Sequence, residues 1–254
     1  MNPSPLEFRT GVIKPLECIK EGWALIKDQY WLFFGISLVG VLIGGAFAIV
    51  LMGPMMAGVF YCLLRRHEGE PVEFGMLFKG FDYFVQGLIA GLLKMLPIMI
   101  LMVPYYIFLI AMMLPNMLRQ DHPGPEETQR FMLSFFGFEM LFVAAIMVVS
   151  MLVEIFFMFA YPLVVDRKLS GLEAVKLSIK AGKANFGGVL GLILLSGLFS
   201  IIGVLCCFVG VYFYLPVALA AQAVAYRRVF PFIPGLTAPQ SPLPPPPPPG
   251  SWAT

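Results

Sequence analysis

Three charged side chains that lie inside long apolar runs are the residues of this sequence best placed to do chemistry. Lys94 interrupts the run 84–114, and Glu139 and Glu154 interrupt the run 131–161. An ionisable group inside a membrane span is costly and usually faces a partner, a cavity or the membrane surface. Counted from the ends of the runs, Lys94 lies ~15 Å deep and Glu154 ~10 Å deep.

These similar depths predict an intramembrane ion pair between Lys94 and Glu154. Snorkelling of Lys94 to the lipid headgroups and a role in transport are the alternatives. Glu139 belongs to the outer half of its run, and we expect it to contact water at a tilted helix end.

The other reactive side chains do not form a catalytic or metal-binding pattern. In the topology derived below, His67 and His122 lie on opposite sides of the membrane, and Asp121-His122 has no nucleophile nearby. The four cysteines lack C-x-x-C spacing and are interpreted as small buried apolar residues, not as a disulfide framework or zinc ligands. We therefore expect no enzyme activity, cofactor or metal.

Composition indicates the class of protein that must position these charges. Of 254 residues, 59% are hydrophobic and 13% are charged, about half the charged share of an ordinary soluble domain, ~25%. The net charge of +2 comes from scattered residues, which excludes a nucleic-acid footprint. The sequence predicts an all-α, polytopic transmembrane helical bundle in the lipid bilayer.

Hydropathy predicts six spans and three amphipathic helices at the cytoplasmic membrane surface. Two spans lie within 31–64 and turn at Gly44-Gly45. The other four are 84–114, 131–161, 186–206 and 209–226, and the span 131–161 ends before Pro162. Residues 115–130 are the expected loop. The interfacial helices are 12–30, 72–81 and 169–186. The domains are an interfacial segment 1–30, a six-span domain 31–228 and a proline-rich tail 229–254.

The basic residues set the orientation of these spans. With a cytoplasmic N-terminus, fourteen of the 17 Lys and Arg residues lie on the cytoplasmic side, Arg119 and Arg130 lie outside, and Lys94 lies within a span. This positive-inside bias predicts a multi-pass protein of the cytoplasmic (inner) membrane with both termini in the cytoplasm.

The two ends of the six-span domain resemble each other. A shift of 156 residues places Glu17 on Glu173, and a shift of 162 places Pro54 on Pro216 and Arg65-Arg66 on Arg227-Arg228. The pattern predicts a parallel internal repeat with the third and fourth spans inserted between its units. Prolines inside spans are expected to kink them: Pro54, Pro97, Pro104 and Pro216.

Two further features suggest contacts outside the bundle. Lysines of the segment 169–186 are candidate contacts for anionic lipid headgroups, with capping of the bundle as the alternative: Lys176, Lys180 and Lys183. The tail favours polyproline II and contains a candidate docking segment for a cytoplasmic partner, with a passive linker as the alternative: Leu243, Pro244, Pro245, Pro246 and Pro247.

Several boundary motifs resemble a group of uncharacterised bacterial six-helix integral membrane proteins. The group is distantly similar to the membrane domain attached to some glycerophosphodiester phosphodiesterases. The similar stretches are Gly53–Gly58, Gly69–Phe81, Tyr161–Lys168, Leu172–Ser178 and Cys207–Phe230. The resemblance implies a fold and carries no catalytic residues over to this chain, and it does not include the tail.

Two functions are consistent with these features. The first is a non-catalytic scaffold or accessory subunit of a membrane complex, which other membrane-protein subunits would contact. The second is a small-solute or ion transporter, indicated by the intramembrane charges, the prolines and the repeat. A continuous polar cavity at Lys94 would favour transport, and a tightly packed bundle would favour the scaffold.

Overall fold

The computed structural model describes residues 7–47, 49–118, 124–205 and 209–232, and this part of the chain is helical without a strand. Helical segments in it are long and apolar enough to cross a membrane, as expected of a multi-pass membrane protein. There are five such segments among the described residues: Pro15–Ala46, Phe74–Pro115, Pro125–Asp166, Phe186–Leu205 and Val209–Val229.

The first helices form a short hairpin. Helix α1 (Pro15–Ile26) leads through the 3-10 turn η1 (Lys27–Gln29) into α2 (Tyr30–Ala46) and then α3 (Met52–His67). The expected turn at Gly44-Gly45 is wrong, because α2 continues to Ala46 and the turn follows it. Gly44 instead lets α2 approach α3, since an added Cβ would lie 3.1 Å from Met52 Sδ.

The middle of the chain forms a much longer hairpin. The 3-10 helix η2 (Phe74–Tyr83) leads into α4 (Phe84–Leu118), and α5 (Pro125–Phe157) returns to the short helix α6 (Ala160–Asp166). The expected loop 115–130 is too long, because both helices extend into it. The predicted span end before Pro162 is also wrong, because α6 continues through this residue. A proline is tolerated in the first turn of a helix, where its missing N–H would have no partner.

The last helices repeat the order of the first. Helix α7 (Gly171–Ala184) precedes α8 (Phe186–Leu205) and α9 (Val209–Val229), as α1 precedes α2 and α3. Their packing partners differ, because α1 packs on α9 and α8 whereas α7 packs on α4 and α5. The long hairpin therefore packs on α7, whereas α1 packs on the last two helices.

Small residues allow the closest helix contacts. A Cβ added at Gly22 of α1 would lie 2.6 Å from the backbone nitrogen of Ala221 in α9. A Cβ added at Gly53 of α3 would lie 2.0 Å from the carbonyl oxygen of Gly87 in α4. Both contacts bring backbone against backbone, which a larger residue would prevent.

The prolines expected to kink spans have different positions. Pro54 is the third residue of α3, where the missing N–H is not needed, so it lies at a helix start and not at a mid-helix kink. Pro97 and Pro104 lie inside α4 and Pro216 lies inside α9. Near Pro216 the Tyr30 hydroxyl donates to the carbonyl oxygen of Phe213 over 2.7 Å, which ties α9 to the start of α2.

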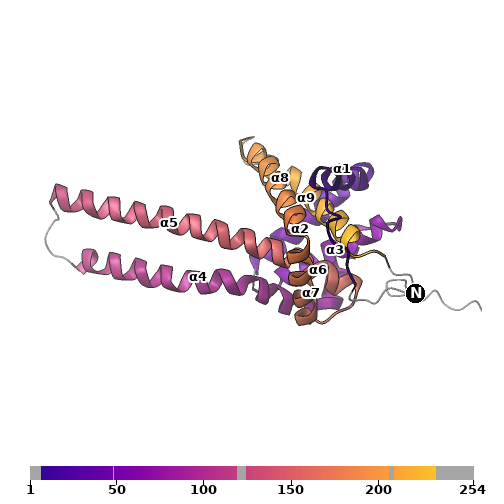
Figure 1. Ribbon diagram of the computed structural model, residues 1–254, viewed down its shortest axis with the longest axis horizontal. Helices are drawn as coiled ribbons and strands as arrows, with labels where there is room; N and C mark the ends of the chain where they lie inside the picture. The colour runs from indigo at the N-terminus through magenta and orange to yellow at the C-terminus, as the bar shows by residue number, and fades with distance from the viewer. Residues whose placement is uncertain (1–6, 48, 119–123, 206–208, 233–254) are drawn as a thin grey trace, which may run out of the picture.

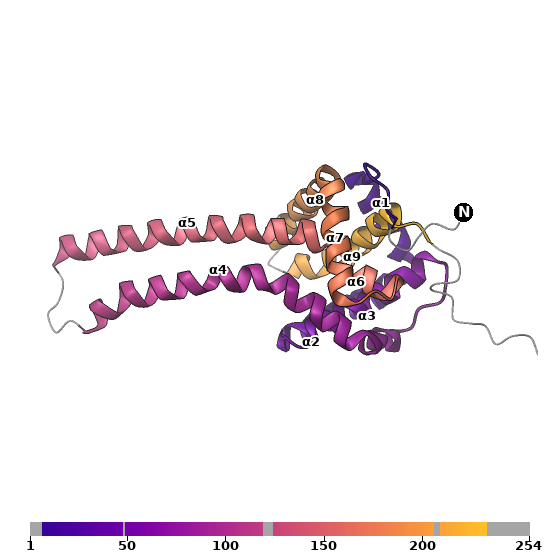
Figure 2. The same ribbon diagram turned by 60° about the horizontal axis from the view of Figure 1, so that its bottom comes forward.

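The long hairpin projects from the other helices, which pack together at one end of the molecule (Figures 1 and 2). From Leu92 to Leu152, no residue whose side chain the structure describes is buried. We call the segments 95–118 and 125–152 the distal hairpin, and the remaining helices the bundle. The bundle contains the buried core, with large buried side chains such as Tyr226, Phe60 and Phe159.

Candidate functional site

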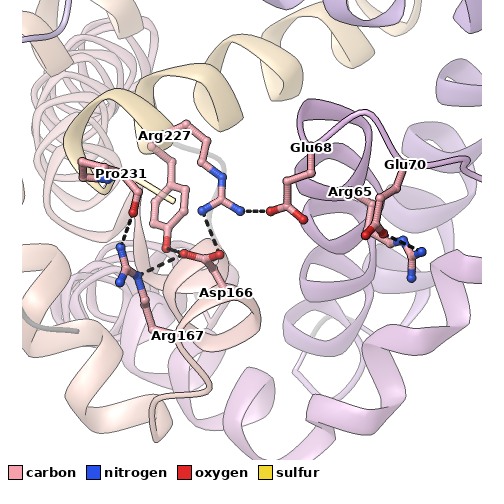
Figure 3. Close-up of polar contacts among 8 residues, drawn as sticks. Arg65, Glu68, Glu70, Asp166, Arg167, Arg227 and Pro231 are labelled. Carbon is pink, nitrogen blue, oxygen red and sulfur yellow. Dashed lines mark hydrogen bonds and ion pairs between the residues drawn. The ribbon is translucent and has the colours of Figure 1, made fainter. Parts of the chain in front are cut away.

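Charged residues meet in a buried cluster where α3, α6 and α9 end (Figure 3). Asp166 is the last residue of α6, Arg227 lies in the last turn of α9, and Glu68 follows α3. The side chains of Asp166, Arg167 and Arg227 are each at most 5% exposed. We call Glu68, Asp166, Arg167 and Arg227, together with Arg65, Glu70 and Tyr226, the polar cluster.

Asp166 is the centre of the polar cluster. Its Oδ1 lies 2.8 Å from Arg227 Nη1, and its Oδ2 lies 3.1 Å from Arg167 Nε. The Tyr226 hydroxyl donates to the same Oδ2 over 2.5 Å. Arg167 Nη2 donates to the carbonyl oxygen of Pro231 over 2.7 Å, which ties the segment after α9 to α6. One carboxylate therefore joins α6 to α9 through two side chains of α9, Tyr226 and Arg227.

Glu68 and Arg65 extend the polar cluster to α3. Arg227 Nη2 also contacts Glu68 Oε1, and Arg65 Nη2 lies 2.5 Å from Glu70 Oε2. Burial raises the pKa of Glu68 above its usual range, although the Arg227 guanidinium opposes this shift. The carboxylates of Asp166, Glu68 and Glu70 thus balance the three arginines, and this balance favours a structural connection over a site for a charged ligand.

The second arginine of each double-arginine pair holds α1. Arg66 Nε donates to the carbonyl oxygen of Leu25 over 3.1 Å, and Arg66 Nη2 lies 3.6 Å from Asp28. Arg228 Nη2 lies 2.7 Å from Glu21 and 3.1 Å from Glu17. Both arginines therefore fasten α1 to the bundle. Sequence reasoning placed the double arginines at membrane boundaries but did not pair them with these carboxylates.

The structure brings Lys94 of α4 and Glu154 of α5 together where the distal hairpin leaves the bundle. Lys94 Nζ lies 2.7 Å from Glu154 Oε2, and it also lies 5.7 Å from the ring centroid of Tyr161. The two side chains are 26% and 31% exposed, respectively. This pair is thus more open than the Asp166–Arg227 pair of the polar cluster.

A cavity of about 360 Å³ adjoins the Lys94–Glu154 pair. Side chains from α2, α3, α4, α5, α6 and α9 line it, and most of them are apolar, such as Met52, Met56 and Leu219. Besides the Lys94–Glu154 pair, the lining includes the uncharged polar residues Tyr161 and Gln222. The space beside the Lys94–Glu154 pair is therefore an apolar pocket with a polar wall.

Glu139 accepts a hydrogen bond from the Tyr105 hydroxyl over 2.7 Å, between α5 and α4. Aromatic rings continue this contact, with centroids 3.9 Å apart for Tyr105 and Phe142 and 3.6 Å apart for Phe108 and Phe138. Sequence reasoning placed Glu139 in water at a helix end and missed this partner. The signal available in the sequence was a tyrosine, Tyr105, in one predicted span and a carboxylate, Glu139, in the next.

The three lysines of α7, Lys176, Lys180 and Lys183, are exposed. Lys176 and Lys180 line a groove of about 550 Å³ together with apolar side chains such as Phe8, Leu177 and Ile179. Ser170 caps α7 by accepting from the backbone N–H of Glu173, and hydrogen bonds from Ser170 lower the pKa of Glu173. The cap fixes the start of the helix that presents this basic face.

Several predicted residues lie outside the described part of the chain: His122, Cys206, Cys207 and the tail segment from Leu243 to Pro247. Within the described part, no group of three or more His, Cys, Asp or Glu residues could hold a metal ion. The chain matches no family model, no curated protein and no solved structure.

Proposed function

We propose that this chain is a non-catalytic integral membrane scaffold or accessory subunit, and that its distal hairpin packs on another membrane-protein subunit. The observation that carries the proposal is the contrast between the buried core of the bundle and the distal hairpin, in which no described side chain is buried. Glu139 inside the distal hairpin and the Lys94–Glu154 pair at its base have partners within the chain. An apolar outer surface with satisfied charges suits helix packing in the membrane.

The exposed apolar surface of the distal hairpin supports a partner. Its α4 segment, 95–118, is ~36 Å long at ~1.5 Å per residue, so with an ordinary tilt it fits a hydrocarbon core of ~30 Å. Near the tip, Met117 is 79% exposed and Leu133 is 66% exposed. In the membrane such side chains contact either lipid or another helix, and a second subunit would replace lipid on one face of the hairpin.

The finer topology belongs to the same proposal. We infer six crossings with both termini in the cytoplasm of an inner membrane, with α1, η2 and α7 at the cytoplasmic surface. The boundary motifs support a relation to bacterial six-helix membrane proteins, and the repeated helix order supports a parallel duplication. Anionic lipids at Lys176, Lys180 and Lys183, and a cytoplasmic partner for the proline-rich tail, are the further partners that we propose.

Photo-crosslinking in native membranes tests the accessory role. A photoreactive amino acid is placed singly at successive positions of α4 from 100 to 114, and crosslinks are resolved by mass spectrometry. We expect one membrane protein to be captured from positions on one face, recurring every three or four residues as on a helix. Positions on the exposed face of α8, such as Leu198, are the matched control.

A lipid-only environment would give a different crosslinking pattern. If all positions of α4 capture lipid alone, or if Leu198 captures the same protein with equal yield, the accessory role is contradicted. The helical periodicity distinguishes a specific interface from random collision in the membrane.

A transporter is the second candidate, and the cavity beside Lys94 and Glu154 is the observation that favours it. Its mostly apolar lining supports this function less well, because a polar solute or ion needs polar partners along its route. Solute flux into liposomes that Lys94→Ala abolishes would establish transport. Equal flux through the variant and the parent protein would reject Lys94 as part of a route.

A further inference from the structure

The cavity beside the Lys94–Glu154 pair has the character of a small-molecule site. Its volume of about 360 Å³ falls within the range of ligand pockets, ~300–1,000 Å³. Three of the apolar side chains that line it come from different helices: Val41 of α2, Met56 of α3 and Leu215 of α9. Convergence of six helices on one apolar space with a polar wall distinguishes it from the featureless surface of the distal hairpin.

We propose that this cavity binds a neutral amphiphile, a molecule with an apolar body and one uncharged hydrogen-bonding end. The inference is independent of the accessory role proposed above. At ~30 Å³ per water-sized group, the cavity holds about a dozen non-hydrogen atoms. A medium-chain alcohol has this size and this chemistry.

The ion pair determines the charge of the ligand. Lys94 and Glu154 neutralise each other over 2.7 Å, and the other side chains that line the cavity are uncharged. A ligand with a net charge would add an uncompensated charge to an apolar space, which is strongly unfavourable. A neutral end group keeps the balance.

The same pair can hold a hydroxyl group. The Lys94 ammonium has three N–H donors and uses one of them on Glu154, so it can also donate to a ligand oxygen. Glu154 can accept a hydrogen bond from the ligand hydroxyl, and the Gln222 amide on the cavity wall offers both a donor and an acceptor. The methionines Met52, Met56 and Met158 adapt to an alkyl chain because their side chains are flexible.

Photolabelling tests the site in the full-length protein in phosphatidylcholine nanodiscs. The probe is 1-decanol with a diazirine in its alkyl chain, and labelled residues are mapped by mass spectrometry. We expect labelling at Met52, Met56 and Met158 that excess unlabelled 1-decanol lowers at least tenfold. Matched diazirine probes ending in a carboxylate or a trimethylammonium group should label these residues at least fivefold less.

Two cavity-filling variants and one control complete the test. Leu219→Trp, or the milder Met56→Phe if the first does not fold, should lower labelling at the remaining cavity residues at least fivefold. Leu96→Trp makes the same substitution as Leu219→Trp at an exposed position of α4 and should leave labelling unchanged. Replacement of both Lys94 and Glu154 by Leu should remove the preference for the hydroxyl end.

Other outcomes would overturn the proposal. Labelling that follows exposed positions of the distal hairpin and ignores the cavity variants would indicate simple partition into lipid. If the preference for the hydroxyl probe persists after Lys94 and Glu154 are both replaced by Leu, the cavity accepts alkyl chains without polar recognition. Stronger labelling by either charged probe would contradict a neutral ligand.

Discussion

The polar cluster of the bundle and the Lys94–Glu154 pair at the base of the distal hairpin hold their charges in different ways. Asp166 is 3% exposed and contacts Arg167, Arg227 and Tyr226, so its loss leaves buried cations behind. Lys94 and Glu154 keep about a quarter to a third of their surfaces exposed and adjoin a cavity.

The difference separates a structural connection from an adaptable site. The polar cluster joins three helix ends, and each of its carboxylates has an arginine partner. The Lys94–Glu154 ion pair joins α4 to α5, and these two helices project from the bundle (Figure 2). A charge in the first region should therefore matter more for stability, and a charge in the second should matter more for what the cavity accepts.

Asp166→Asn should have the largest effect. It removes the charge between two buried arginines, and breaking a buried pair of this kind costs about 3–5 kcal/mol. Thermal unfolding in detergent, followed by circular dichroism, measures the loss. Asp82→Asn, at an exposed carboxylate of η2, is the matched control. A loss for Asp166→Asn no larger than the control's would remove the basis of the comparison.

Lys94→Ala and Glu154→Ala should each have an intermediate effect of about 1–3 kcal/mol, because part of each side chain is exposed. The double replacement should cost less than the sum of the single ones, since no unpaired charge remains. A double-mutant cycle on the unfolding free energies measures this coupling. Purely additive losses would show that the two charges act independently.

Ser170→Ala should lower stability by about 1 kcal/mol through loss of the α7 cap. The Ser170 hydrogen bonds lower the pKa of Glu173, so the stability they add is present above the ordinary pKa of 4.5 and is lost as pH falls through the folded-state value. Melting curves from about pH 7 to about pH 3 should therefore show a weaker acid dependence in the variant. Ser134→Ala, at an exposed serine of α5, should reproduce the parent curve.

Tyr105→Phe should have the smallest effect. It removes the hydrogen bond to Glu139 while the ring stack with Phe142 remains. We expect a small fall in melting temperature, below that of Ser170→Ala, with Tyr106→Phe on the same turn as the control. A fall as large as that of Lys94→Ala would mean that the distal hairpin depends on Glu139 more than on its base.

Much of the helical architecture follows from patterns visible in the sequence. Apolar run length predicted the long helices, because membrane spans have few other solutions. The ends of runs were less predictable. A turn was predicted at Gly44-Gly45, but both residues lie within α2, and Gly44 allows close packing of α2 on α3.

Site prediction depended on how isolated each charge was. Lys94 and Glu154 stand alone in apolar runs, so depth counting could match them. Asp166 and Arg227 lie among other charges at run ends, where many pairings are equally allowed by sequence. Their pairing depends on how α6 and α9 pack, which periodicity does not specify.

Shortening the distal hairpin tests the central claim most directly. Residues 101–147 are replaced by a short Gly-Ser turn that keeps Lys94 and Glu154, and the chain is purified from native membranes under mild conditions. The account predicts that the bundle keeps its unfolding free energy within about 1 kcal/mol, because changes at distant sites affect each other little. It also predicts that the crosslinked partner subunit is lost. Unfolding of the bundle, or retention of the partner, would contradict it.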